Sequence, residues 1–381
     1  MSGRRGLVFT PATLFLAGLA LRPQIVGVGP LVPRIQSGLD VSHTVAGLLA
    51  TIPVLCMGVF APLAPPLLRR FGSRAAVGGS LVGAAAFGFA RAVMPDAALV
   101  LLLTVPIGLG IAVAGTLLPA IVKGELAARP TLGTGLYTTG INVGATVAAV
   151  VAVPLAVLWS WRLPLVVFSA ATLLVAALWL RRSHATPRAE RAPLPVRNPV
   201  AWLLVAIFAL QSSMFYGFNA WLSDTYVERG WSQGAGGGLV AAMNGAALLV
   251  GALTAFAADR RGSRRAYVGS AAAAAAAAAA LVAADVAGAW AWALVLGAAM
   301  GVLFTIVMTL PLDVANGPAE VAAATTLMLG VGYVISALAP TALGALRDAT
   351  GTFAAPVAVL AGVGAALAAL APLLQTRSSP T

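Results

Sequence analysis

The sequence predicts an all-α membrane protein with twelve transmembrane helices in two six-helix bundles and with both termini in the cytoplasm. Three observations support this fold class. The chain of 381 residues is 60% apolar and only 9% charged, whereas a soluble domain carries roughly 25% charged residues. Apolar segments of membrane-crossing length recur from end to end. A basic loop occurs twice, at matching places in the two halves of the chain.

Each apolar segment is long enough to cross a bilayer as a helix. Such a helix needs about 20 residues to span the roughly 30 Å hydrocarbon layer. An outer-membrane barrel would show alternating segments of about ten residues instead. The predicted spans are 7–32, 44–67, 76–93, 97–122, 133–158, 163–180, 200–222, 238–257, 266–284, 288–312, 320–346 and 354–374.

The distribution of basic residues predicts the orientation of the chain. If the N-terminus is cytoplasmic, most of the 23 Lys and Arg fall in inside segments, whereas the acids show no such bias. This asymmetry is the positive-inside rule, which counts Lys and Arg and not net charge. The net charge of +12 therefore reports topology and does not indicate a nucleic-acid partner. The basic residues expected outside are Arg34, Arg91, Arg162, Arg229 and Arg347.

A polar, Arg- and Pro-rich segment divides the chain into two halves. Residues 181–199 are predicted to be a flexible cytoplasmic linker between an N-terminal bundle, 1–180, and a C-terminal bundle, 200–381. The two halves share the sequence Gly-Ser-Arg, which begins at Gly72 after the second span and at Gly262 after the eighth. Two halves related by an axis along the membrane normal are one plan of secondary transporters, with the substrate site near midplane.

Arg22 is the most informative residue because it lies near the middle of the first predicted span. An arginine at that depth costs about 2.5–3.5 kcal/mol and by default faces a protein interior or a water-filled cavity. No acid lies near the middle of a predicted span to pair with it. Its forked donors match planar oxyanions, which favours an anion ligand. The alternative is a structural arginine that binds carbonyls and polar side chains. Pro23 predicts a kink at this charge.

Polar side chains recur at helical spacing in several other spans. In span 5 they lie four residues apart, at Thr134, Thr138, Asn142 and Thr146. Such stripes are typical of a wet cavity, although interhelical hydrogen bonds are the alternative. The Gly140 and Gly144 pair in the same span predicts a close helix approach. The predicted substrate-binding residues are Arg22, Gln24, Tyr137, Thr138, Asn142, Gln211, Tyr216, Asn219, Asn244 and Tyr333.

The sequence contains no recognisable enzyme or metal motif. Cys56 is the only cysteine, and the two histidines, His43 and His184, fall in predicted loops on opposite sides of the membrane. No Walker loop, HExxH or GxSxG motif is present. We therefore expect no enzyme activity, metal or cofactor. A non-transporting membrane sensor is an alternative, but the predicted termini leave little room for a soluble output domain.

The repeated loop resembles the signature Gly-x-x-x-Asp-Arg-x-Gly-Arg-Arg of the major facilitator superfamily. The second copy has the acid as Asp259, whereas Arg69 stands at the matching place in the first copy. The resemblance implies gating roles for the loop residues, but the departure at Arg69 puts the usual salt bridge in doubt for the N-terminal half. The gating residues that it implies are Arg70, Gly72, Arg74, Asp259, Arg260, Arg261 and Gly262.

Within this superfamily the chain resembles the cyanate and 2-nitroimidazole transporter family. The matching stretches are 21–30, 135–139, 211–222 and 332–348. This resemblance implies an inner-membrane transporter, acting as a monomer in the lipid bilayer, that moves a small solute, such as the anion cyanate, by alternating access. A proton-coupled exporter of drugs or nitro-heterocycles is the alternative. No carboxylate or histidine near midplane indicates proton coupling, so exchange or facilitated diffusion is favoured.

Overall fold

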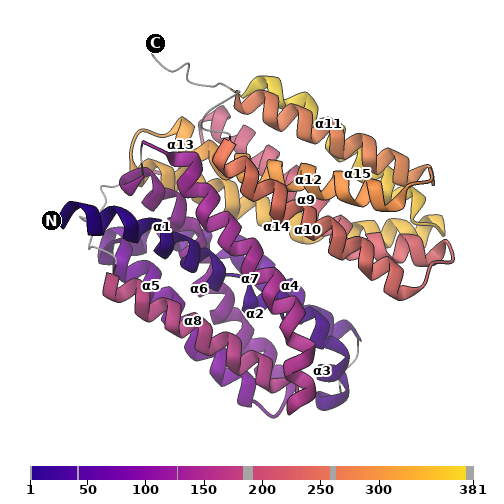
Figure 1. Cartoon of the computed structure of the whole chain (residues 1–381), viewed down its shortest axis with the longest axis horizontal. Coiled ribbons are helices and arrows are strands. Elements are labelled where there is room, and N and C mark those ends of the chain that lie inside the picture. Colours follow the sequence, from indigo (N-terminus) through magenta and orange to yellow (C-terminus); the bar gives the residue numbers. More distant parts are fainter. Residues whose placement is uncertain (1, 41–42, 127, 183–191, 258–262, 375–381) are drawn as a thin grey trace. The chain divides into compact units, whose positions relative to one another are not determined.

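The computed structural model describes residues 2–40, 43–126, 128–182, 192–257 and 263–374, and every regular element in them is helical (Figure 1). The first half contains α1 (Ser2–Ala20), α2 (Pro23–Val26), η1 (Gly29–Leu31), α3 (Val32–Leu39), α4 (His43–Val59), η2 (Ala61–Leu63), α5 (Ala64–Val93), α6 (Ala97–Glu125), α7 (Pro130–Leu158) and α8 (Arg162–Arg182). The second half contains α9 (Pro199–Glu228), α10 (Gln233–Ala257), α11 (Arg264–Ala283), α12 (Ala289–Val307), α13 (Leu310–Val314), α14 (Pro318–Thr350), α15 (Ala354–Leu370) and η3 (Ala371–Leu373).

Within these described ranges, ten helical segments are long and apolar enough to cross a membrane. The predicted spans 7–32 and 44–67 are built from shorter pieces, because α1 ends at Ala20 and α4 ends at Val59. Residues 192–198 of the predicted linker contain no helix, and residues 183–191 lie outside the described part. The all-helical class is confirmed, whereas twelve spans remain a prediction.

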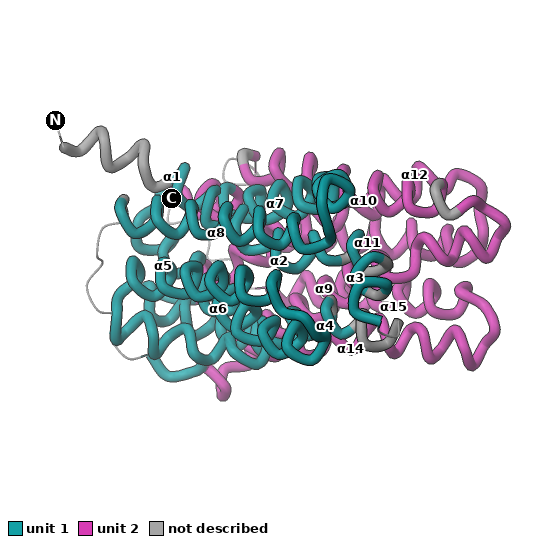
Figure 2. The backbone as a smooth tube through the Cα atoms, turned by 90° about the horizontal axis from the view of Figure 1, so that it is seen from below, with its two compact units in different colours: residues 1–128, 136–194, 315–330 teal, residues 129–135, 195–314, 331–381 magenta. Residues whose placement is uncertain are grey.

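The chain forms two compact units, which Figure 2 colours separately. Unit 1 comprises residues 1–128, 136–194 and 315–330, and in it α5 packs against α6 and α8. Unit 2 comprises residues 129–135, 195–314 and 331–381, and in it α10 packs against α12 and α11 against α15. Helices α7 and α14 therefore each contribute residues to both units.

Glycines bring the backbones of paired helices into contact. A Cβ atom on Gly140 of α7 would lie 2.1 Å from the carbonyl oxygen of Phe15 in α1, and one on Gly144 would lie 2.2 Å from that of Leu19. The predicted close approach at these two glycines is confirmed. Unit 2 has a similar contact: a Cβ atom on Gly297 of α12 would lie 2.0 Å from the carbonyl oxygen of Met243 in α10. Small residues allow this contact, which drives helix association in membranes.

Basic residues at several helix ends bind carbonyl or carboxylate oxygens. Arg162 donates to two carbonyls at the end of α5, at 2.9 and 2.6 Å. Arg229 forms a 3.0 Å ion pair with Asp285, and Arg347 forms a 3.3 Å ion pair with Glu228. Helix C-termini leave carbonyls without intrahelical donors, and cations there are favourable. These arginines therefore fasten helix ends within their own units.

The first copy of the repeated loop is a single sharp kink at Gly72. The helix α5 continues on both sides of this residue, but Gly72 itself has φ 75° and ψ 168°. Only glycine adopts this region of backbone conformation without strain. The chain can therefore turn between the predicted second and third spans with almost no loop.

Replacing Gly72 with Ala is expected to destabilise the protein by about 1–3 kcal/mol, the usual cost of such a backbone conformation for a residue with a Cβ atom. The expected readout is a lower apparent Tm of the detergent-solubilised protein. Gly79→Ala is the matched control, because Gly79 lies in the same helix and its Cβ would meet no atom within 4 Å. An equal Tm for the two variants would show that the kink does not require glycine.

Candidate functional site: a buried arginine at a helix break

The first predicted span is broken at Arg22. Helix α1 ends at Ala20, and α2 begins at Pro23 with Arg22 at its N-cap position, φ −111° and ψ −29°. Proline has no backbone N–H and its ring clashes with the carbonyl four residues earlier, so a helix cannot pass through it undisturbed. The kink expected from Pro23 is confirmed. Arg22 is buried, with 9% of its surface exposed, and it is not without an interaction partner.

Gln24 lies two residues after Arg22 and is 1% exposed. Its side-chain oxygen accepts a 2.8 Å hydrogen bond from Arg91 of α5. Its side-chain nitrogen donates a 2.8 Å hydrogen bond to Ser169 of α8. The predicted role of Gln24 in substrate binding remains a prediction, but the structure shows that both ends of this amide bind protein groups.

Arg91 is the buried cation that the sequence reasoning missed. The sequence predicts only that Arg91 lies towards the outside, and the structure adds that it lies in the last turn of α5 and is only 1% exposed. Besides the Gln24 side chain, it binds the Gln24 carbonyl oxygen at 3.2 Å and Thr104 of α6 at 3.3 Å. One signal was available in the sequence, because Arg91 lies inside the predicted span 76–93 and not beyond its end.

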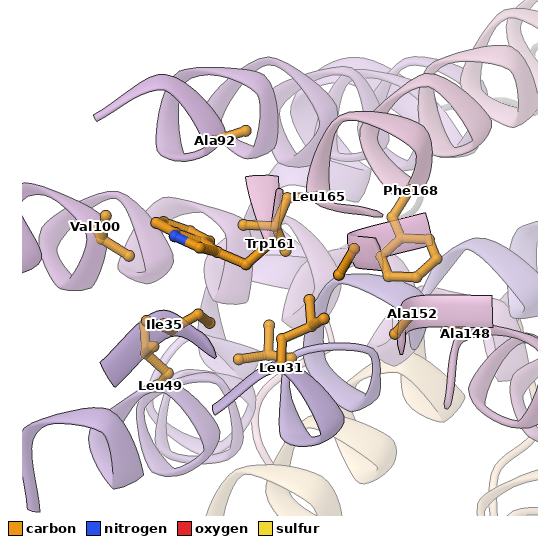
Figure 3. Close-up of a cluster of buried hydrophobic side chains, with 12 residues drawn as sticks. Leu31, Ile35, Leu49, Ala92, Val100, Ala148, Ala152, Trp161, Leu165 and Phe168 are labelled. Atoms are coloured by element: carbon orange, nitrogen blue, oxygen red, sulfur yellow. The ribbon is translucent and has the colours of Figure 1, made fainter. Parts of the chain in front are cut away.

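An apolar cluster anchors the chain just after the break. Leu31 and Ile35 pack into it with Trp161, the residue before α8, and with Leu165 and Phe168 of α8 (Figure 3). Helix α7 adds Ala148 and Ala152 to the same cluster. This cluster fixes the segment that follows Arg22 to the body of unit 1, so the break is held from its C-terminal side.

The polar residues of α7 differ in their surroundings. Tyr137 and Thr138 are buried in unit 1, and a Cβ on Gly18 of α1 would lie 2.0 Å from the Tyr137 carbonyl oxygen. Asn142 is half-buried, and its carbonyl accepts a 2.9 Å hydrogen bond from Thr146, which is exposed. The structure thus brings Tyr137 against α1, the helix that ends two residues before Arg22.

In unit 2 the predicted residues form two groups. The side-chain nitrogen of Asn244 in α10 donates to the side-chain oxygen of Asn219 in α9 at 2.9 Å. Gln211, which is buried, accepts a weak 3.4 Å hydrogen bond from Ser212 in α9. Tyr216 is half-buried in the same helix. The structure therefore confirms that α9 and α10 present amides to one another.

Tyr333 of α14 packs against an aromatic ring of α9. Its ring meets the ring of Phe208 in α9 edge to face, with centroids 4.9 Å apart. It is 4% exposed. Edge-to-face pairs contribute about 0.5–1.5 kcal/mol beyond their buried area, so Tyr333 also has a packing role in unit 2.

The loop residues implied in gating are only partly described. The Arg70 guanidinium lies 5.4 Å from the ring centroid of Phe71, and Arg74 is exposed. Asp259, Arg260, Arg261 and Gly262 lie outside the described residues. Arg264, which the predicted set did not include, forms a 3.1 Å ion pair with Asp313 and donates to Thr131 at 2.8 Å. This arginine is the counterpart of Arg74 in the repeated Gly-Ser-Arg sequence.

Where the structure describes the chain, no group of three or more His, Cys, Asp or Glu residues is placed to hold a metal ion. The polar groups at the break are guanidinium, amide and hydroxyl groups, which donate hydrogen bonds and do not ligate cations through carboxylates. Donors of this kind are able to form hydrogen bonds to an anion or to the acceptor atoms of a polar neutral molecule.

Comparison with known proteins identifies the fold and the broad class. The model of the Major Facilitator Superfamily matches residues 14–340. The cyanate transport protein CynX of Escherichia coli (strain K12) is 30% identical over 356 residues, which cover 89% of this chain and 90% of that protein. The 2-nitroimidazole transporter of the same organism is 27% identical over 365 residues, 94% of this chain and 92% of that protein.

Among solved structures, the proton:xylose symporter XylE superimposes with a TM-score of 0.79 over 96% of this chain and 95% of that one. The identity is 13%, so this likeness concerns the fold alone. The ten apolar helices and the two transporter relatives define a multi-pass membrane transporter of small solutes. More particularly, the chain belongs to the Major Facilitator Superfamily.

Proposed function

We propose that the protein moves a small anion, such as cyanate, by alternating access, with the guanidinium of Arg22 as the anion ligand. The observation that carries this proposal is a cation buried at the break between α1 and α2. An arginine held inside a membrane is costly, and such residues mark substrate pathways by default. An arriving anion offsets that cost through charge-assisted, forked hydrogen bonds.

The relatives support the choice of substrate class. One is named for cyanate, a small linear anion, and the other for 2-nitroimidazole, a planar polar heterocycle. Both ligands are small and planar or linear, and both carry acceptor atoms that suit a guanidinium donor. Cyanate is favoured for this chain because a fixed positive charge at the site attracts an anion more strongly than a neutral molecule.

We extend the proposal to polar side chains in each unit that would line the substrate's route. In unit 1 these are Tyr137, Thr138 and Asn142, beside Gln24. In unit 2 they are Gln211, Tyr216, Asn219, Asn244 and Tyr333. The Asn219–Asn244 hydrogen bond supports this role, because paired amides at 2.9 Å place further donors and acceptors on the adjoining faces of α9 and α10.

The proposed topology has twelve spans in the inner membrane and cytoplasmic termini. The pieces α1, α2 and η1 would make the first span, and α4, η2 and the start of α5 the second. We propose that the halves 1–180 and 200–381 act as the two moving domains of a functional monomer, joined by the linker 181–199. The signature residues Arg70, Gly72, Arg74 and Asp259–Gly262 would act at the cytoplasmic gate.

Export of neutral nitro-heterocycles is the second candidate, favoured by the 2-nitroimidazole transporter relative. The two candidate functions are distinguished by measuring uptake of cyanate, nitrate, a carboxylate and 2-nitroimidazole into proteoliposomes. Saturable uptake of an anion, absent from empty liposomes, is the expected result. Uptake of the neutral heterocycle alone would overturn the anion proposal. A protonophore added to the same assay shows whether movement depends on a proton gradient.

A further inference from the structure

The break in the first span leaves a backbone carbonyl in need of a donor. In an α-helix the N–H of Val28 would donate to the carbonyl of Gln24, four residues earlier. Here Val28 donates instead to Ile25, at 3.3 Å. Gln24 is 1% exposed, so its freed carbonyl is shielded from bulk water and is stabilised by a donor from another protein group.

Arg91 supplies that donor from a different helix. Its terminal nitrogen Nη2 lies 3.2 Å from the Gln24 carbonyl oxygen and 2.8 Å from Oε1 of the Gln24 side chain. Its other terminal nitrogen, Nη1, donates to Thr104 of α6 at 3.3 Å. One guanidinium therefore joins α5, α2 and α6 at a position from which solvent is excluded.

The Gln24 amide extends the same network to α8. It donates to Ser169, which in turn donates to the carbonyl of Leu165 at 2.7 Å. Room for this amide depends on Gly88, one turn before Arg91. A Cβ atom on Gly88 would lie 2.5 Å from the Ser169 hydroxyl oxygen and 2.8 Å from the Gln24 side-chain nitrogen.

We propose that Arg91 is a positioning residue that clamps Gln24 and so holds the break in the shape that presents Arg22 to the substrate. This role rests on the proposed function of Arg22. Gln24 follows Arg22 by two residues, with Pro23 between them, so a fixed Gln24 backbone leaves Arg22 few alternative directions. Arg91 itself does not touch the substrate in this arrangement.

The clamp requires an arginine because its two terminal nitrogens serve partners on two different elements. A lysine has one terminal nitrogen on a flexible stem and cannot reproduce this planar arrangement. Hydrogen bonds to charged groups contribute about 1.5–3 kcal/mol, so their loss corresponds to a change of at least tenfold in an equilibrium constant.

The test measures transport and local exchange in the same variants of the full chain. Arg91→Gln is expected to raise the KM for cyanate about tenfold or more, with a smaller effect on Vmax. It is also expected to speed amide hydrogen exchange in peptides that cover residues 21–28 without substrate. Arg91→Lys is expected to show smaller increases than Arg91→Gln in both the KM and the exchange rate, but not wild-type values.

The control is Arg229→Gln, because Arg229 also donates to a backbone carbonyl, that of Val282, but lies in unit 2 and does not touch Gln24. It is expected to leave KM and the exchange of 21–28 unchanged. Should Arg91 variants fail to fold, Gly88→Ala disturbs the same amide without removing a charge. Its control is Gly83→Ala in the same helix, where a Cβ meets no atom within 4 Å.

The outcomes separate this inference from the proposed function. Unchanged exchange in residues 21–28 for Arg91→Gln and Gly88→Ala would overturn the clamp. Faster exchange with an unchanged KM would overturn the positioning role. If the wild-type protein moves no anion, the proposed function fails, and the exchange measurement alone decides whether Arg91 holds the break.

Discussion

Replacing Arg22 with Gln is expected to reduce cyanate uptake into proteoliposomes by about 30-fold or more, because removing one partner of a desolvated, hydrogen-bonded charge pair costs about 2–5 kcal/mol. Glutamine keeps a similar length and a hydrogen-bond donor but loses the charge and the fork. Arg22→Lys keeps the positive charge but not the forked donors, so its cyanate uptake is expected to lie between those of the wild type and Arg22→Gln. Initial rates at several cyanate concentrations give both KM and Vmax for each variant.

The matched control is Arg34→Gln. Arg34 lies twelve residues further along the chain, beyond the predicted span 7–32, in α3, and is exposed. Its side chain donates a long 3.5 Å hydrogen bond to the carbonyl of Ala156. Loss of transport in Arg22→Gln alone, with both proteins monodisperse, supports the ligand role. Wild-type rates in Arg22→Gln would leave Arg22 with a structural role.

Gly140→Leu is expected to produce the largest loss of stability. Its Cβ would lie 2.1 Å from the carbonyl oxygen of Phe15 and 2.9 Å from the backbone nitrogen of Leu19, so α1 and α7 must move apart. Overpacking of this kind costs about 3 kcal/mol or more. For chains of 150–250 residues each kcal/mol lowers Tm by about 2–4 °C. We therefore expect a clearly lower apparent Tm in detergent and reduced expression in the membrane.

Gly79→Leu provides the control for this prediction. Gly79 also lies inside a helix, α5, but it is exposed and nothing lies within 4 Å of its Cβ position. Leucine is a better helix former than glycine by up to about 1 kcal/mol. The control is therefore expected to match or exceed the wild-type Tm. Equal Tm values for Gly140→Leu and Gly79→Leu would show that α1 and α7 do not need this contact.

Local chemistry made some features of the site predictable. Pro23 cannot donate a backbone hydrogen bond, so the break beside Arg22 follows from covalent structure alone. Gly140 and Gly144 lie four residues apart on one helical face, so their close contact with α1 follows from helix geometry. Both expectations concern residues near in sequence, and both are confirmed.

Arg91 could not be placed in the same way. A basic residue near the end of an apolar segment is ordinarily read as facing water, because long side chains reach the interface. What buries Arg91 is the meeting of α5 with α2 and α6, whose residues Gln24 and Thr104 lie 67 and 13 positions away in sequence. No local pattern encodes such partners.

The sequence by itself determined that this is an all-helical membrane protein, because apolar segments about 20 residues long and few charges leave no soluble alternative. It also singled out Arg22, since a charge in an apolar segment is conspicuous from composition alone. Only the tertiary structure decided which polar groups meet: Arg91 with Gln24, Asn244 with Asn219, and Arg264 with Asp313. The reason is physical, because hydrogen bonds between helices depend on side-chain positions in three dimensions, which helix periodicity does not specify.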